Sequence, residues 1–221
     1  MRGGDGHVRA PGQTDWRCPG DVDRHAAGVA SPSPQSYPAA VATLTISLPP
    51  QASQTAFNLR RWEELLADAE LARVEGRIES DRHGHVLTSP PPAPLHGSFQ
   101  SEIVFLLRSL MLHGRVLTEC PISTADGVRA ADVAWASAEC LQELGNRAGF
   151  PRSPELCVEV LSPANTGEEM REKVALYFDA GAHEVWLCDS NGRMRFLGSP
   201  TGRPRRKPAL CPQFPKRVEL R

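Results

Sequence analysis

The stretch ELCVEVLSPANTGEEMREKVALYFDAGAHEVWLCD, residues 155–189, decides the fold of this chain. Its two ends, 155–161 and 184–189, are short and almost wholly apolar, which predicts buried strands. The residues between them have the apolar spacing of a helix over about 167–180. A strand, a helix and a second strand in this order favour a crossover connection that leaves the two strands parallel in one sheet.

The predicted helix has signals at both ends. Thr166 or Asn165 can cap its first turn, because either side chain can accept a hydrogen bond from a free backbone N–H. Gly181 follows its last turn and can adopt the left-handed backbone conformation that ends many helices. The helix is therefore expected to have sharp boundaries.

Outward from this unit, further periodic patterns predict the remaining elements. Apolar residues at three- and four-residue intervals predict helices, and short runs bounded by turn residues predict strands. The expected helices lie over about 59–69 and 96–113, and the expected strands over 73–79, 84–88, 115–118, 128–135 and 194–197. Hairpins among these strands make the sheet mixed, so the predicted fold class is α/β, with a mixed central sheet flanked by helices.

The N-terminal part of the chain has a different composition. Residues 1–55 are rich in Gly, Pro, Ala and Ser and show little periodicity, so they bury too little apolar surface to offset the entropy of ordering. We expect a disordered leader, or an extension that results from a misassigned start codon. Residues 56–221 are expected to form a single domain.

The bulk properties of the sequence limit the classes of protein it can belong to. The chain has 221 residues, a hydrophobic fraction of 40% and a net charge of −1. These values suit a globular domain rather than a basic nucleic-acid coat, so any contact with nucleic acid must rest on a local patch. One basic run is most simply a solvated segment, although it could also contact phosphate; it consists of Arg203, Arg205, Arg206 and Lys207.

Cysteine spacing and hydropathy bear on metal binding and location. The six cysteines include no CxxC pair, which argues against a zinc cluster of the usual spacing. The start of the chain lacks the apolar core of a signal peptide, and no apolar run is long enough to span a membrane. We therefore expect a reduced cytoplasmic protein that does not contact a membrane.

Two carboxylates stand where apolar residues are expected. Asp132 lies in AADVAWA, residues 130–136, and Glu159 lies in LCVEVLSP, residues 156–163. Both segments otherwise have the pattern of buried strands, and an unpaired ionised carboxylate there would cost on the order of several kcal/mol. A positive group should therefore lie between the two side chains.

Lys173 can supply part of that positive charge. Met170, Lys173 and Tyr177 follow one another at i, i+3 and i+7, so they share one face of the predicted helix. If this face packs on the sheet, the ammonium and the phenol hydroxyl point toward the carboxylates. Two carboxylates and a lysine around a cavity are typical of metal-assisted hydrolysis, with Mg²⁺ held by hard oxygen ligands.

Each of these residues also has a simpler interpretation. Glu159 could face solvent at a strand edge, and Asp132 could be a structural residue that bonds a loop backbone. Lys173 could form an ordinary surface ion pair with Glu169, four residues earlier. His96, which precedes a glycine near the start of a predicted helix, could cap that helix or simply be exposed.

Several segments in order resemble the Uma-two family of predicted restriction endonucleases, which belongs to the PD-(D/E)XK nuclease superfamily. The likeness runs from about residue 60 to the C-terminus. The segments are SPPPAPLHG (89–97), LTECPISTADGVRAADVAWAS (117–137), PELCVEVLSPAN (154–165), EKVALYFDAGAHEVWLCD (172–189) and CPQFP (211–215). The resemblance implies a restriction-endonuclease-like core and an ordered C-terminal segment, with Phe214 and Val218 docked on it.

The resemblance also implies the metal ligands. Asp132 matches the Asp of the "PD" element and Glu159 matches the Glu of the "(D/E)XK" element. Their side chains, with the backbone carbonyl of Val160, would hold the divalent metal. The sequence departs from the superfamily pattern at Ala131, which replaces a proline that supplies no ligand, and at Leu161, which replaces the usual lysine.

The missing lysine has a counterpart elsewhere. In the Uma-two family the lysine comes from the following helix, which fits Lys173, the residue that the helix face indicates independently. Glu79, at the end of RIE, resembles a further family carboxylate. His96 matches the family's HG element, whose role does not follow from its chemistry.

The function expected from this resemblance is a Mg²⁺-dependent (or Mn²⁺-dependent) endonuclease that hydrolyses DNA and leaves a 5′-phosphate and a 3′-hydroxyl. DNA is then the expected partner, and a homodimer is possible because superfamily members often cut both strands as dimers. Two alternatives stay open: an inactive DNA- or protein-binding member of the fold, and a hydrolase of a smaller phosphoester. An intact set of two carboxylates and a lysine favours an enzyme.

Overall fold

The computed structural model describes residues 51–163 and 165–220, and these belong to one compact unit. The expectation for residues 1–50 lies outside the described residues. The elements, in chain order, are α1 (Gln51–Ala67), the 3₁₀ helix η1 (Leu71–Arg73), β1 (Arg77–Ser80), β2 (Val86–Ser89), α2 (Pro94–Leu110), β3 (Arg115–Thr124), β4 (Gly127–Ala136), α3 (Ala138–Leu144), β5 (Leu156–Val160), α4 (Gly167–Asp179), β6 (Glu184–Cys188) and β7 (Met194–Leu197).

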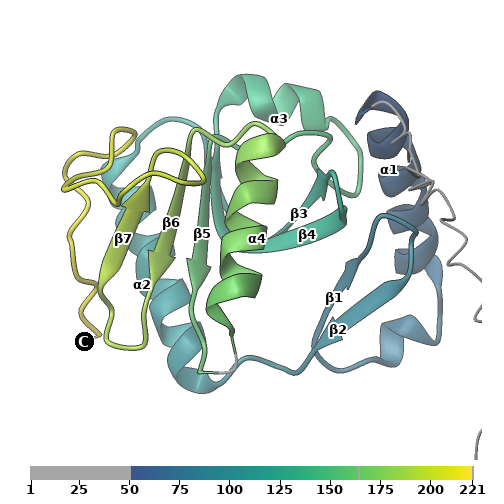
Figure 1. Cartoon of the computed structure of the whole chain (residues 1–221), viewed down its shortest axis with the longest axis horizontal. Helices are drawn as coiled ribbons and strands as arrows, with labels where there is room; N and C mark the ends of the chain where they lie inside the picture. The colour runs from purple at the N-terminus through teal and green to yellow at the C-terminus, as the bar shows by residue number, and fades with distance from the viewer. Residues whose placement is uncertain (1–50, 164, 221) are drawn as a thin grey trace, which may run out of the picture. The chain divides into compact units, whose positions relative to one another are not determined.

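A five-stranded mixed sheet forms the centre of the described unit (Figure 1). Its strand order is β3-β4-β5-β6-β7; β5 and β6 run parallel and every other neighbouring pair is antiparallel. The predicted strand–helix–strand unit is confirmed, since β5 pairs with β6 and α4 connects them. The predicted fold class is therefore correct.

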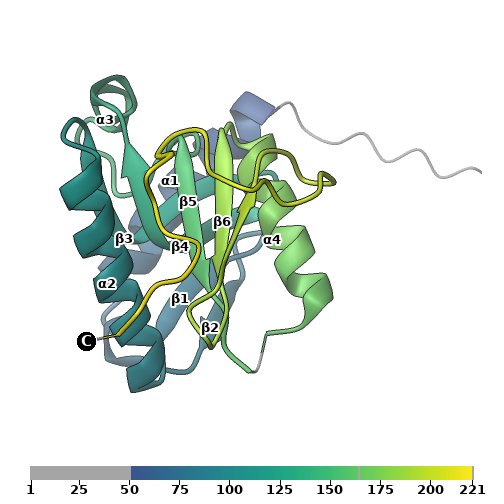
Figure 2. The ribbon, with the colours of Figure 1, turned by 90° about the vertical axis from the view of Figure 1, so that its left-hand side faces the viewer.

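Helices cover both faces of the sheet, and Figure 2 shows α2 on one side and α4 on the other. On the α4 side, Met170, Val174 and Tyr177 belong to one buried apolar cluster. On the α2 side a second buried cluster includes three side chains of that helix, and it also takes in the C-terminal segment through Phe214 and Val218, as predicted. The cysteines of both clusters are buried free thiols: Cys120, Cys140, Cys157, Cys188 and Cys211.

Helix α4 begins and ends as its sequence predicts. Of the two candidate caps, Thr166 holds the N-cap position: its hydroxyl accepts a hydrogen bond from the backbone of Glu169, and the Glu169 side chain bonds back to the cap. This reciprocal pair satisfies two backbone donors that the helix leaves free. At the other end Gly181 adopts a φ of 108°, which a side chain would strain.

The first hairpin lies later in the sequence than expected. The sequence predicts a strand over 73–79, but Leu71–Arg73 form η1, and β1 begins only at Arg77, after Gly76 with its positive φ of 114°. A Cβ at Gly76 would lie 2.1 Å from the carbonyl oxygen of Ser89, so the close approach of the two strands requires glycine there. The hairpin β1–β2 forms a sheet of its own, beside β4.

Further differences from the prediction concern β3, α3 and α1. Strand β3 continues through Pro121 to Thr124; a proline is tolerated there because β3 is an edge strand. Helix α3 is absent from the prediction because its seven residues are too few to show a periodic pattern. Helix α1 begins at Gln51, before the expected start of periodic structure.

Two further predictions concern the basic run at 203–207 and the membrane. In the basic run, Arg205 pairs with the buried Glu184 at 3.1 Å, and the other basic residues of the run are exposed. Among the helices of the described residues, none is long and apolar enough to cross a membrane.

Candidate active site

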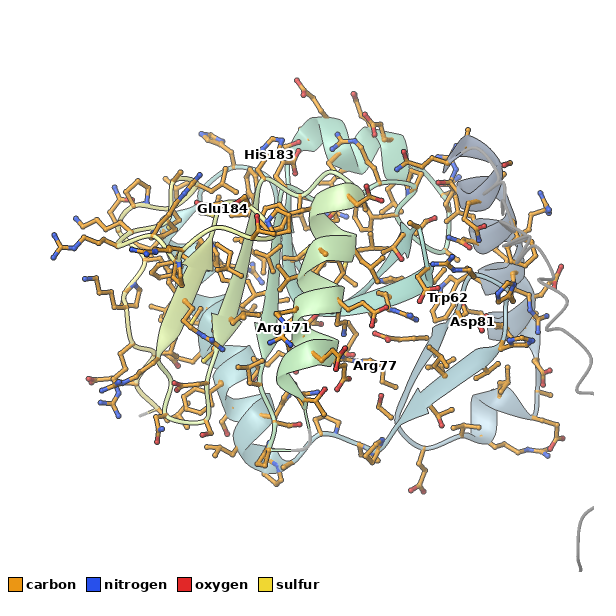
Figure 3. The ribbon with its side chains drawn as sticks, viewed as in Figure 1. Trp62, Arg77, Asp81, Arg171, His183 and Glu184 are labelled. Atoms are coloured by element: carbon orange, nitrogen blue, oxygen red, sulfur yellow. The ribbon has the colours of Figure 1, made fainter. Side chains whose placement is uncertain are left out.

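A cleft of about 970 Å³ opens between α4, the hairpin β1–β2 and the loop that leads into α2. Asp132 from β4 and Glu159 from β5 lie on its floor with Lys173 from α4, Glu79 from β1 and His96 from α2. Figure 3 shows Arg77, another residue of the lining, beside α4 on its hairpin side. The cleft therefore brings together all four side chains predicted to be catalytic.

Asp132 is almost completely buried, with an exposed fraction of 1%, in the middle of β4. Its Oδ2 atom accepts a hydrogen bond of 2.6 Å from the backbone N–H of Val160 and lies 3.2 Å from Nε2 of His96. Its Oδ1 atom accepts a hydrogen bond from Nη2 of Arg77. The carboxylate is thus held by a strand backbone and two side chains, which orients it toward the cleft.

These contacts determine the protonation of Asp132 and His96. Burial raises the pKa of Asp132, but the hydrogen bond from His96 and the charge of Arg77 outweigh it and lower the pKa to about 2. The hydrogen bond to Asp132 raises the pKa of His96 above its usual 6.5, against the effect of burial. The two simple interpretations of His96 are wrong, because it neither caps α2 nor lies exposed; its side chain is 11% exposed and contacts Asp132.

Glu159 lies inside β5 and is 4% exposed, so it does not face solvent at a strand edge. The hydroxyl of Tyr177 donates to its Oε1 at 2.7 Å, and Nζ of Lys173 donates to its Oε2 at 3.3 Å. Burial raises the pKa of Glu159 to about 7; the charge of Lys173 opposes this effect and repulsion from Asp132 adds to it. Burial therefore favours the protonated form of this carboxyl more strongly than in a solvated glutamate.

Lys173 points toward the carboxylates, as the helix face predicts. Its ammonium lies 3.3 Å from Glu159 and 3.1 Å from Oε1 of Glu79, and it donates to the backbone carbonyl of Ala130 at 3.1 Å. The alternative partner, Glu169, closes the capping box of α4 instead. Burial lowers the pKa of Lys173, but the negative charges of Glu159 and Glu79 outweigh this effect. The net result is a raised pKa, so the amine stays protonated.

Glu79 is the fourth predicted residue of the cluster. Its Oε1 atom accepts a hydrogen bond of 2.9 Å from the backbone N–H of Ala130, next to its ion pair with Lys173. Glu79 therefore joins the hairpin to β4 two residues before Asp132. For Val160, the structure gives a contact between its backbone N–H and Asp132; a role for its carbonyl as a ligand stays a prediction.

Sequence reasoning missed three residues that hold the site together. Arg77 binds Glu119 through two hydrogen bonds of 2.8 and 3.0 Å, and it also donates to Asp132. Gln100 donates to Glu119 at 2.9 Å and to the carbonyl of Asp132 at 2.8 Å. Arg77 stands two residues before Glu79 on one strand, so their shared face was a usable signal. Nothing in the sequence marks Glu119 or Gln100, because their contacts depend on tertiary placement.

The donor set fits a hard divalent cation in its chemistry. Asp132 and Glu159 supply carboxylate oxygens, and Mg²⁺ is often held by one or two carboxylates with the remaining positions left to water and phosphate. Within residues 51–163 and 165–220, no group of three or more His, Cys, Asp or Glu side chains is spaced to hold a metal ion.

The raised pKa of Glu159 predicts a dependence of stability on pH. Between its usual pKa of 4.5 and about 7, the folded state holds a proton that the unfolded state has lost. The free energy of unfolding should therefore fall as pH rises, by about 2 kcal/mol between pH 4.5 and 6. The hydrogen bond to Asp132 raises the pKa of His96 above 6.5, so His96 stays protonated in the interval from pH 4.5 to 6.

Denaturant unfolding in EDTA of the wild type and Glu159→Gln, at several pH values, measures this effect. The free energy of unfolding of the wild type should fall steadily relative to that of Glu159→Gln as pH rises through the window, because Gln carries no proton to lose. Parallel curves would show that the Glu159 carboxyl titrates normally in the folded protein.

Comparisons with known proteins bear on the fold and on the family. The family Uma2, described as "Putative restriction endonuclease", matches residues 62–214. A crystal structure of "a putative nuclease belonging to DUF820" from Anabaena variabilis has a similar fold: the TM-score is 0.51 at 18% identity, over 62% of this chain and 80% of that one. No curated protein matches the chain.

Proposed function

Because the chain belongs to the Uma2 family, described as "Putative restriction endonuclease", we propose that it is a divalent-metal-dependent endonuclease that hydrolyses DNA phosphodiester bonds. The family supports a nuclease function, and DNA as the substrate and Mg²⁺ or Mn²⁺ as the cofactor are the finer parts of the proposal. We assign the nuclease domain to residues 56–221, which contain the matched range 62–214.

The observation that carries the proposal is the convergence of Asp132, Glu159 and Lys173 in one cleft. The two carboxylates come from adjacent strands of the sheet, and the lysine comes from the helix that follows the second strand. All three side chains are largely buried, yet each lines the cleft. Buried ionisable groups that converge in a cleft are typical of active sites.

Asp132, Glu159 and the carbonyl of Val160 would hold the cation. A divalent cation bound there supplies charge that polarises a phosphoryl oxygen and makes water a stronger acid. The hydrogen bonds from Val160 N–H and His96 fix the orientation of the Asp132 carboxylate. The Tyr177 hydroxyl does the same for Glu159.

The protonation of Lys173 points to its role. A raised pKa keeps the ammonium charged, so it cannot take a proton from water at neutral pH. A fixed ammonium at the floor of the cleft can stabilise the negative charge that develops on the phosphoryl oxygens during hydrolysis. We therefore assign Lys173 as a charge stabiliser rather than a general base.

The net negative charge of the cleft lining supports a requirement for metal cations in phosphate binding. Its lining contains six carboxylate residues, three Lys or Arg residues and one histidine: Glu79, Glu119, Asp132, Glu159, Glu169 and Glu172 against Arg77, Arg129, Lys173 and His96. Such a surface repels phosphate unless added cations neutralise it. The same acidic lining favours a second candidate function, hydrolysis of a smaller phosphoester, because a DNA groove is usually basic.

Incubation of the full chain with supercoiled plasmid, single-stranded DNA and bis(4-nitrophenyl) phosphate, each with Mg²⁺, Mn²⁺ or EDTA, separates these functions. We expect metal-dependent nicking of the plasmid with 5′-phosphate and 3′-hydroxyl ends, and no cleavage in EDTA. Turnover of the small diester alone would favour the second candidate. No turnover of any substrate with either metal would contradict the proposal that the protein is an enzyme.

A further inference from the structure

Arg77 occupies one side of the Asp132 carboxylate. Oδ2 of Asp132 is already held by two donors, the backbone N–H of Val160 and the ring of His96. Arg77 is the donor to Oδ1 among the described contacts. A metal cation that binds Asp132 would therefore use Oδ1, and in this structure the guanidinium of Arg77 occupies that position.

A second carboxylate anchors the same guanidinium. Glu119 accepts from Nε and Nη2 of Arg77 in the two-bond geometry that suits a guanidinium and a carboxylate. Glu119 is also the one non-glycine residue of the described chain with a positive φ, 48°, and Gln100 holds its side chain from α2. A backbone conformation of this kind is costly and persists where its surroundings fix it, often at functional sites.

We propose that Arg77 has two alternative partners: Asp132 when the cleft holds no divalent cation, and a phosphate of the substrate once a cation has taken Oδ1 of Asp132. The pair with Glu119 keeps the guanidinium in the cleft in both states. The inference rests on the proposed function for its second state, whereas the first state concerns only metal binding.

The chemistry of the site explains why an arginine serves here. A guanidinium keeps its charge at every physiological pH and offers five donors in one plane, so it can leave one acceptor while it holds another. Cation binding at Asp132 would place two positive charges against one carboxylate, which drives Arg77 away from it. Phosphate oxygens accept the same two-bond geometry as a carboxylate, and the side chain of Arg77 already lines the cleft.

Titration of the full chain with Mn²⁺ alone, followed by the electron paramagnetic resonance of free Mn²⁺, tests the first state. Arg77→Met should bind Mn²⁺ about tenfold more tightly than wild type, because no guanidinium has to be displaced. Arg129→Met is the matched control. It removes another arginine of the same cleft, but one that pairs with Asp126 rather than Asp132, and its Mn²⁺ affinity should change less than about twofold.

Arg77→Met leaves the Glu119 carboxylate without its arginine, and this carboxylate could then bind Mn²⁺ itself or destabilise the fold. A double variant controls for both effects. In Arg77→Met/Glu119→Gln both partners of the pair are neutral, and the tighter binding should persist. Unchanged or weaker Mn²⁺ binding in a folded single or double variant would overturn the proposal. That result would leave cleavage by the wild type intact, so it is distinct from a failure of the nuclease function.

Binding of a fluorescent DNA duplex tests the second state. The background is Lys173→Met, which slows cleavage, at the high pH where this variant retains Mn²⁺ binding. There Arg77→Met should weaken duplex binding about tenfold in Mn²⁺ and leave it unchanged in EDTA, where Arg77 is paired with Asp132. Equal affinities in Mn²⁺ would overturn the transfer of Arg77 to phosphate. A single substitution that tightens metal binding and weakens DNA binding is not the signature of a merely structural arginine.

Discussion

Replacement of Asp132 by Asn should lower the rate of metal-dependent DNA cleavage by about a thousandfold or more. Asn keeps the size of the side chain and can still accept the hydrogen bond from the Val160 backbone, but it loses the negative charge that attracts a cation. Arg77 would remain paired with Glu119, so we expect the fold to persist with a loss of about 2 kcal/mol in unfolding free energy.

Single-turnover nicking in Mg²⁺ measures this effect, and denaturant unfolding checks the fold. Asp126→Asn is the matched control, because Asp126 also pairs with arginines, at 2.6 Å to Arg129 and 2.9 Å to Arg82, but does not line the cleft. It should cut within about twofold of wild type. Cleavage by folded Asp132→Asn within tenfold of wild type would remove Asp132 from the metal site.

Replacement of Lys173 by Met should slow cleavage by about a hundredfold to a thousandfold while metal binding is retained at high pH. The loss of its charge removes the main influence that lowers the pKa of Glu159, so this pKa should rise above its present value near 7. A higher pH is then needed to ionise Glu159. Binding of Mn²⁺ should accordingly shift to higher pH in this variant.

Rates and Mn²⁺ affinities measured from pH 6 to 9 separate the two effects of this substitution. Arg171→Met is the control, since it removes a positive charge from the exposed surface of the same helix (Figure 3) and should change neither quantity by more than about twofold. A Lys173→Met variant that cuts at the wild-type rate would show that the lysine only neutralises its carboxylate neighbours.

The parts of the fold that the sequence predicts well are those with strong local signals. The parallel pair β5–β6 follows from two apolar runs around a capped helix, and Gly181 marks the end of that helix. The predicted start of β1 is too early, because residues 74–76 lie between η1 and the strand and end in Gly76, whose positive φ precedes the paired residues. The separate sheet of the first hairpin depends on its packing beside β4, which no local pattern records.

The residues of the candidate site also fall into those with a local sequence signal and those without one. Asp132 and Glu159 stand out because a charge in an apolar strand is costly, and Lys173 follows from the periodicity of its helix. The partners that balance these charges come from distant parts of the chain. His96 and Arg77 reach Asp132 across 36 and 55 residues of sequence, so only the folded structure reveals them.

The most direct test of this account is the nicking of supercoiled plasmid by the full chain in Mg²⁺ and in EDTA, with wild type and Asp132→Asn compared in one experiment. We expect nicked plasmid for the wild type in Mg²⁺ alone, and none for the wild type in EDTA or for Asp132→Asn in either condition. Nicking that survives EDTA, or that is equal in folded Asp132→Asn, would contradict it.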